Sequence, residues 1–271
     1  MTSATVSPSA VQTRIEACRA EGRAALVGYL PAGFPDIETS ITGLRAMVEG
    51  GVDVIEIGLP YSDPVMDGPT IQRAAETALV AGMRTRDVFH VVEAVAATGT
   101  PTLVMTYWNP IERWGVERFA ADLAAAGGAG LITPDLIPDE ADEWIDAAEQ
   151  HDLDRVFLVA PSSPTERIAL TARACRGFIY ATSVMGVTGA RQNTSTAAPA
   201  LVGRVRAETD LPVGVGLGVS DGAQAAEVAA FADAVVVGSA FVRPLLDTAD
   251  REAGIAAIRA LTADLADGVR A

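Results

Sequence analysis

Glu56 and Asp67 carry the clearest chemical signal in the sequence. Glu56 interrupts the apolar run at residues 54–59, and a buried carboxylate is costly unless it is paired or protonated. Asp67 follows in a loop, residues 60–69, that three prolines stiffen. Because carboxylates in different environments can divide the roles of general acid and general base, we predict an acid–base pair. The alternatives are a glutamate satisfied by the backbone or by an arginine, and an ordinary aspartate-rich turn.

Three glycine-containing turns follow the later strand-like runs and predict a phosphate site. Glycine lets backbone N–H groups come close to a phosphate, and a helix N-terminus adds a favourable dipole. Any one of these turns also fits an ordinary strand end, so the prediction depends on their occurring together. The residues concerned are Thr188 and Gly189 in the first turn, Gly218 in the second, and Gly238 with Ser239 in the third.

Three further polar residues end strand-like runs and are candidates to line a substrate site. Tyr107 and Tyr180 each close such a run, although either could be an aromatic side chain that fills a barrel interior. Asp135 is a candidate substrate ligand that also fits a helix N-cap or a turn.

Short β-rich runs alternate with helix-like stretches along the whole chain, which predicts an α/β fold. Most of the runs are almost continuously apolar, as parallel strands buried on both faces are. Eight such runs match a single (β/α)8 TIM barrel with a short extra N-terminal segment. An open doubly wound sheet is the alternative, but the turn after the first run lacks its G-x-G-x-x-G pattern. The expected strands are residues 25–30, 54–59, 102–107, 130–134, 156–159, 177–182, 213–217 and 234–237.

Helix-like stretches separate these runs, and one of them, residues 85–97, lengthens the second βα unit. We expect residues 1–12 to be a flexible N-terminal tail and residues 13–271 to form one barrel domain. The tail has no basic start followed by an apolar stretch, so it does not resemble a signal peptide. No run reaches the ~18 apolar residues of a membrane helix, and we expect a cytoplasmic location. The other expected helices are residues 37–49, 70–80, 116–126, 140–150, 166–175, 199–208, 223–230 and 255–266.

The composition argues against several classes of reaction and ligand. All 20 basic residues are arginine, so no side-chain amine is available for Schiff-base chemistry. His90 and His151, both in predicted helices, are too few for a histidine-rich metal site, and we expect no metal. Cys18 and Cys175 have no partner at metal-ligand spacing and are expected to be reduced, packed thiols. A net charge of −15 without a basic patch argues against nucleic acid.

Taken in order, these segments resemble the tryptophan synthase alpha family. The most specific match is E-I-G-L-P-Y-S-D-P-V-M-D-G-P at residues 56–69. Supporting matches are Y-W-N-P at 107–110, P-D-L-I-P at 134–138, G-V-T-G at 186–189, G-L-G-V-S at 216–220 and V-G-S-A at 237–240. The sequence departs from the family at Val184, where members often carry arginine, and at Leu217, where an aromatic often lines the indole pocket.

The resemblance implies a role for each part of the site. Glu56 becomes the catalytic acid and base, Asp67 accepts or orients the indole N–H proton, and Tyr180 assists near the substrate. The glycine turns with Ser239 hold the phosphate, and residues 184–196 form a lid. Pro60, Asp63 and Asn109 would face a beta subunit in an alpha-beta-beta-alpha complex, with pyridoxal phosphate in that partner and no cofactor in this chain.

The implied reaction is the retro-aldol cleavage of indole-3-glycerol phosphate to indole and glyceraldehyde 3-phosphate. The absence of lysine agrees with it, because carboxylates can make both proton transfers without an amine or a metal. The same absence disfavours Schiff-base aldolases, indole-glycerol-phosphate synthase and triosephosphate isomerase. The alternatives are a phosphosugar isomerase that uses Glu56 and Asp67, and a non-catalytic barrel that only activates a partner.

Overall fold

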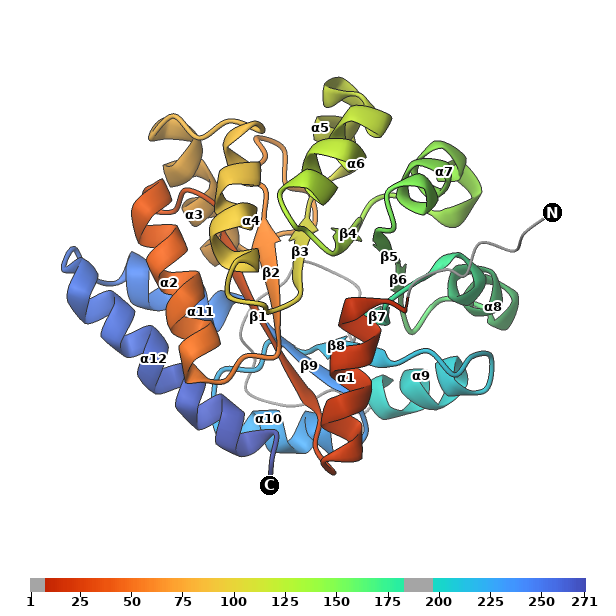
Figure 1. The fold of residues 1–271 in the computed structure, drawn as a ribbon. Helices are drawn as coiled ribbons and strands as arrows, with labels where there is room; N and C mark the ends of the chain where they lie inside the picture. The colour runs from red at the N-terminus through yellow and green to blue at the C-terminus, as the bar shows by residue number, and fades with distance from the viewer. Residues whose placement is uncertain (1–7, 183–196) are drawn as a thin grey trace.

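The strands form one parallel ring that nearly closes on itself (Figure 1). The computed structural model describes residues 8–182 and 197–271, and nine strands in them share one sheet in the order β5-β4-β3-β2-β1-β9-β8-β7-β6. Every pairing between neighbours is parallel. The strands are β1 (Ala25–Pro31), β2 (Val54–Gly58), β3 (Thr102–Met105), β4 (Gly130–Ile132), β5 (Asp154–Val156), β6 (Leu158–Val159), β7 (Ile179–Thr182), β8 (Val213–Gly216) and β9 (Ala234–Val237).

The predicted barrel is confirmed, with its fifth strand divided in two. The run expected at residues 156–159 is interrupted at Phe157, so that β5 pairs with β4 and β6 pairs with β7. The division arises where the ring closes, because this one segment must turn from one neighbour to the other. Phe157 itself is bonded to β7, because its carbonyl accepts a hydrogen bond from the Tyr180 N–H at 3.2 Å.

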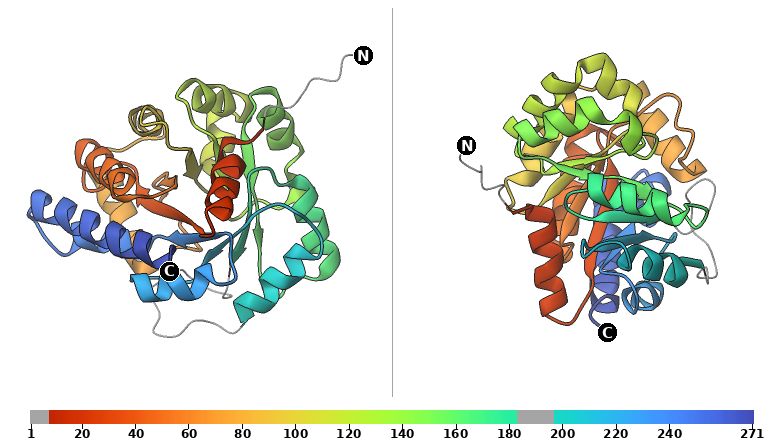
Figure 2. Two further views of the ribbon diagram at one scale, coloured as in Figure 1. Left: turned by 60° about the horizontal axis from the view of Figure 1, so that its bottom comes forward. Right: turned by 90° about the vertical axis from the view of Figure 1, so that its right-hand side faces the viewer.

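Helices surround the ring (Figures 1 and 2), and side chains cap the starts of some of them. For example, the Asp36 side chain accepts the Thr39 N–H at the start of α2, and Gly51 ends that helix with a φ of 108°. The sequence did not predict α5 and α11, both short. The helices are α1 (Ala10–Ala20), α2 (Ile37–Gly50), α3 (Pro69–Val80), α4 (Asp87–Ala96), α5 (Trp108–Trp114), α6 (Val116–Ala125), η1 (Pro138–Glu140), α7 (Asp142–Gln150), α8 (Thr165–Ala174), α9 (Ala197–Arg206), α10 (Gly222–Ala229), α11 (Ser239–Leu246) and α12 (Arg251–Gly268).

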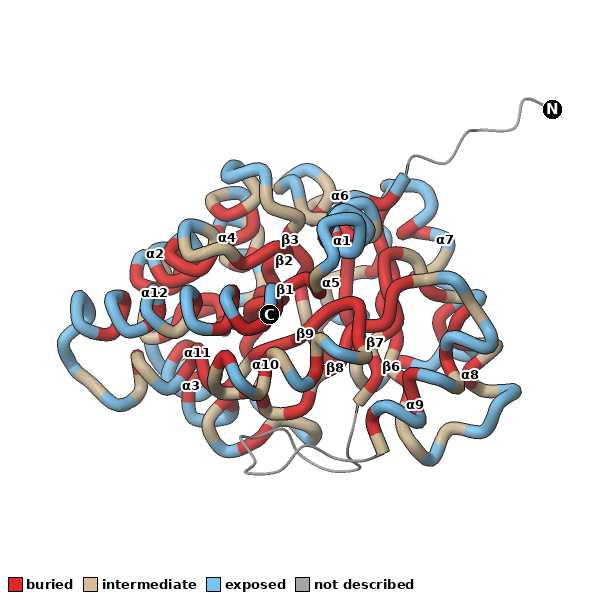
Figure 3. The backbone as a smooth tube through the Cα atoms, turned by 90° about the horizontal axis from the view of Figure 1, so that it is seen from below, coloured by how far each residue is buried: buried red, intermediate tan, exposed pale blue. Residues whose placement is uncertain are grey.

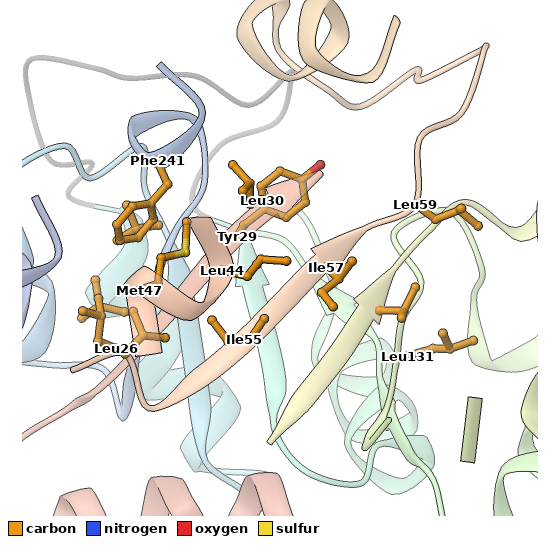
Figure 4. Close-up of a cluster of buried hydrophobic side chains, with 14 of the residues drawn as sticks. Leu26, Tyr29, Leu30, Leu44, Met47, Ile55, Ile57, Leu59, Leu131 and Phe241 are labelled. Atoms are coloured by element: carbon orange, nitrogen blue, oxygen red, sulfur yellow. The ribbon is translucent and has the colours of Figure 1, made fainter. Parts of the chain in front are cut away.

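Apolar side chains fill the space between the strands and the helices, and the outer helix faces are exposed (Figure 3). Figure 4 shows part of this layer, where Leu26, Ile55 and Ile57 meet side chains from the helices such as Leu44. A second cluster combines side chains of α1 with strand residues such as Ala25, Val54 and Ala234. In the part of the chain that the structure describes, no helix is long and apolar enough to cross a membrane.

Helix α1 closes the amino-terminal end of the barrel. Val11, Ile15 and Cys18 are fully buried against the second apolar cluster. The expected tail is therefore wrong for residues 10–12, which form the first turn of α1 because Val11 packs against the barrel. Residues 1–7 lie outside the described residues.

Three buried aspartates at the amino ends of strands bind α1 and its cap. The Ser9 hydroxyl donates to Asp154 at 2.6 Å, and Arg14 bonds Asp53 at 2.6 Å. Arg19 lies 3.4 Å from Asp233. With this end covered, the carboxyl ends of the strands remain for a functional site, as is usual for this fold.

Candidate active site

Glu56 projects from the middle of β2 and is almost completely buried, with 1% of its surface exposed. Its Oε2 atom has no hydrogen-bond partner within the described residues. Burial, with a smaller contribution from the negative charge of Asp67, raises the pKa of Glu56 to about 8. The Glu56 carboxyl is therefore mostly protonated at neutral pH and can donate a proton.

Asp67 reaches the same region from the loop after β2. Burial raises its pKa to about 6, and a hydrogen bond from the Tyr107 hydroxyl limits the rise. The same hydroxyl accepts the Met66 N–H at 2.9 Å, which attaches the loop to the end of β3. Asp67 is thus mostly ionised at neutral pH, and the two carboxyl groups differ in protonation as acid and base partners must.

Tyr180, on β7, approaches Glu56 from the other side of the ring. Burial, with a smaller contribution from the charge of Glu56, raises the pKa of the Tyr180 hydroxyl well above its usual range. An atom added as Cβ at Gly216 would lie 2.5 Å from this hydroxyl. Gly216 therefore leaves the space that the hydroxyl occupies, and the role of Tyr180 beside the substrate stays a prediction.

Tyr29 is a site residue that the sequence did not reveal. It is paired in register with Glu56 on the neighbouring strand and is 7% exposed. Burial and the nearby charges of Asp67 and Glu56 raise the pKa of its hydroxyl well above the usual range. The only signal in the sequence was an aromatic residue with a hydroxyl near the end of the first strand, and its relation to Glu56 depends on strand register.

The residues predicted to hold phosphate lie at the ends of β8 and β9. Gly218 has a φ of 71°, which a side chain would strain. Gly238 precedes α11, whose N-terminus has no side-chain cap, and buried Ser239 is its first residue. By contrast, Asp221 caps the N-terminus of the preceding helix, α10. Backbone N–H groups at the start of α11 therefore remain available to an anion.

Some residues predicted for the site lie outside the described residues, and one has a structural contact. Thr188 and Gly189, with the lid at 184–196, lie among residues 183–196, outside the described residues. Asp135 is exposed and accepts the Trp108 N–H at 2.9 Å, so it holds the start of α5, as a helix cap would. Its contact with substrate stays a prediction.

The residues predicted to face a partner divide into two kinds. Asp63 is exposed at the loop tip, and the Asn109 amide donates to the Tyr61 hydroxyl at 3.0 Å. Pro60 is buried within the chain and offers little surface, so its contact with a partner stays a prediction. Its burial follows from its place directly after β2, below the exposed part of the loop.

The described residues contain no group of three or more histidine, cysteine or acidic side chains that could hold a metal ion. Cys18 and Cys175 are free thiols and both are buried. Burial raises the pKa of Cys18 to about 11 and that of Cys175 to about 12, so neither is a thiolate at neutral pH. The polar groups that face one another at the strand ends are carboxyl and phenol groups.

The fold and the site define a (β/α)8-barrel enzyme with two carboxyl groups of raised pKa in its site. A family model described as tryptophan synthase alpha chain matches residues 15–270. The tryptophan synthase alpha chain of Acidothermus cellulolyticus is 64% identical over 262 residues, with 97% of each chain covered. The chain belongs to the tryptophan synthase alpha chain family, as its motifs predicted. Its function is therefore the cleavage of indole-3-glycerol phosphate in tryptophan biosynthesis.

Solved structures agree with this assignment. Tryptophan synthase from Mycobacterium tuberculosis is similar with a TM-score of 0.92 and 58% identity, covering 98% of this chain and 100% of that chain. A mutant alpha-subunit from Pyrococcus furiosus has a TM-score of 0.82 and 34% identity, covering 90% of this chain and 98% of that chain. The barrel fold is thus shared over almost the whole chain.

Proposed function

We propose that Glu56 makes the proton transfers of the cleavage and that Asp67, as a carboxylate, binds the indole N–H. The observation that carries this proposal is the difference between their surroundings. Glu56 is buried and has a pKa of about 8, whereas Asp67 is bonded to Tyr107 and has a pKa of about 6. At neutral pH one group can donate a proton while the other remains a carboxylate.

In the first step, protonated Glu56 donates its proton to C3 of the indole ring. Asp67 accepts a hydrogen bond from the indole N–H, which stabilises the positive charge that the ring acquires. The bond between C3 and the glycerol carbon then breaks, and its electron pair returns to the ring. The hydroxyl on that carbon loses its proton to the Glu56 carboxylate and becomes the aldehyde oxygen. Glu56 ends protonated, so the cycle is balanced, and Tyr180 assists beside it.

The phosphate group is proposed to bind at the ends of β8 and β9, where β9 is separated from β2 by β1. The uncapped N-terminus of α11 and the turn at Gly218 supply backbone N–H groups and a favourable dipole. Ser239 adds a hydroxyl, and Thr188 and Gly189 are proposed to complete the cradle. Tyr107 and Asp135 are proposed to border the substrate. Because every basic residue in the chain is arginine, we propose that the backbone holds this anion instead of lysine.

An alpha subunit implies a beta-subunit partner, and we propose an alpha-beta-beta-alpha complex in the cytoplasm. In this proposal pyridoxal phosphate belongs to the beta subunit, and the chain itself uses no cofactor. Asp63 and Asn109 would contact the partner, and a contact there would position the loop that carries Asp67. A complex on size-exclusion chromatography, with faster indole release, is the expected result.

The test of the proposed function is direct. The purified chain is incubated with indole-3-glycerol phosphate, with and without a beta subunit, and indole and glyceraldehyde 3-phosphate are measured. Equal amounts of both products are expected. Consumption of substrate without indole, or isomerisation of a phosphosugar instead, would contradict the proposed function.

A further inference from the structure

Tyr29 lies directly beside Glu56 in the barrel. The two residues are register partners on the parallel strands β1 and β2, so their side chains share one face of the sheet. An atom added as Cβ at Gly58 would lie 2.2 Å from the Tyr29 hydroxyl oxygen. Gly58 is two residues beyond Glu56, so the hydroxyl leans toward the carboxyl ends of the strands, as Figure 4 shows.

The ring of Tyr29 also borders the proposed phosphate site. A Cβ added at Gly238 would lie 3.7 Å from the Tyr29 Cδ1 atom and 3.9 Å from its Cβ. Tyr29 therefore extends from the start of α11 at one end to the neighbourhood of Glu56 and Asp67 at the other. A substrate with its phosphate at α11 and its indole at the carboxyl pair would place its glycerol chain along this interval.

The Tyr29 hydroxyl is free to bind such a chain. The Tyr29 hydroxyl makes no hydrogen bond to any residue in 8–182 or 197–271, although only 7% of the residue's surface is exposed. Burial and the adjoining charges raise the pKa of this hydroxyl, so it stays protonated at neutral pH and can both donate and accept a hydrogen bond.

We propose that Tyr29 is a specificity-determining residue whose hydroxyl bonds a hydroxyl group of the substrate's glycerol chain. The inference rests on the proposed function, and it adds a contact between the phosphate site and the carboxyl pair. The same geometry recurs at Tyr180, which is paired with Gly214 and has its hydroxyl over Gly216. Two tyrosines, on β1 and β7, thus present hydroxyl groups toward the centre of the site.

The test compares two small anions that differ only in chain hydroxyls, sn-glycerol 3-phosphate and n-propyl phosphate. Their affinities are measured by titration calorimetry for the unaltered chain and for Tyr29→Phe, which keeps the ring. Loss of one uncharged hydrogen bond should weaken glycerol phosphate binding roughly 2- to 13-fold and leave propyl phosphate binding unchanged. Tyr61→Phe is the matched control, because it removes a hydroxyl that is bonded to Asn109; it should change neither affinity.

Four results would overturn the inference. Equal weakening of both anions would mean that Tyr29 only packs the site, and unchanged binding of both would mean that its hydroxyl contacts neither. If the unaltered chain binds neither anion, the proposed phosphate site fails together with the Tyr29 contact. If the unaltered chain prefers sn-glycerol 3-phosphate to n-propyl phosphate and Tyr29→Phe keeps this preference, only the Tyr29 contact is rejected.

Discussion

The hydroxyl of Tyr107 holds Asp67 at the site. It donates to the Asp67 carboxylate while it accepts the Met66 N–H at 2.9 Å, so one oxygen atom fixes both the loop and the charge of its aspartate. The Tyr61 ring packs on Tyr107 with centroids 5.4 Å apart, which adds support from the same loop. The orientation of the Asp67 carboxylate therefore depends on a residue at the end of a different strand.

Tyr107→Phe should consequently raise the pKa of Asp67, because it removes a hydrogen bond that stabilises the ionised carboxylate. A hydrogen bond to a charged group contributes ~1.5–3 kcal/mol, so the acidic limb of the pH profile should move up by about one pH unit or more. The measurement is kcat/KM for indole release as a function of pH. An unmoved acidic limb would show that this limb does not report Asp67.

The unaltered chain should have a bell-shaped pH profile. Activity should rise as Asp67 ionises, near its pKa of about 6, and fall as Glu56 loses its proton, near its pKa of about 8. A substrate phosphate also titrates near pH ~6, so the Tyr107→Phe shift identifies the aspartate. A profile that stays level from pH ~7 to ~10 would contradict the role of Glu56 as a proton donor.

Gly238→Ala should weaken phosphate binding without unfolding the barrel. An added Cβ meets no atom closer than 3.7 Å and the residue has a negative φ of −114°, so the fold tolerates it. The methyl group would nevertheless stand beside the N–H groups that face the anion. The control is Gly203→Ala in α9, where an added Cβ meets nothing within 4 Å. Equal KM values in both variants would place the phosphate elsewhere.

Asp53→Asn should lower the free energy of unfolding without altering the active site. Asp53 is fully buried and bonds Arg14, Arg23 and the Leu26 N–H, and removing one side of a buried ion pair costs about 3–5 kcal/mol. Urea unfolding at pH 7 measures this loss. The control is Glu49→Gln, whose exposed pair with Arg259 should contribute at most ~1 kcal/mol.

The cost of Asp53→Asn should also depend on pH. Burial alone would raise the pKa of Asp53, but hydrogen bonds from Arg23 and Leu26 outweigh it and the net pKa is lowered. Ionised Asp53 therefore contributes stability above its unfolded pKa of ~3.9, and this contribution is lost as the pH falls through the lower folded value. A cost of the substitution that stays constant down to pH ~2 would contradict this account.

The sequence predicted the strands and the carboxyl pair because their signals are local. Glu56 stands out in an apolar run, and Asp67 lies in a stiff loop immediately after it. The Tyr29 contact could not be predicted in the same way, because it needs the register of β1 against β2 and the space left at Gly58. The role of Tyr107 likewise depends on how a loop folds back over the end of β3.

The sequence also did not predict how the amino-terminal end of the barrel is closed. Ser9 and Asp154 are 145 residues apart, and each looks like an ordinary polar residue near the end of a helix or strand. The expected tail at residues 1–12 followed from its small and polar composition. Its last residues are helical because Val11 reaches an apolar surface that exists only after the ring has formed.

The central claim is that Glu56 donates and recovers the proton in the cleavage, and Glu56→Gln tests it most directly. The amide keeps the shape of the side chain but removes its acid–base capacity. We predict that kcat for indole release falls by at least ~10²–10⁴, while the affinity for sn-glycerol 3-phosphate, measured by calorimetry, is unchanged. Near-normal turnover in Glu56→Gln, with intact binding, would contradict the account.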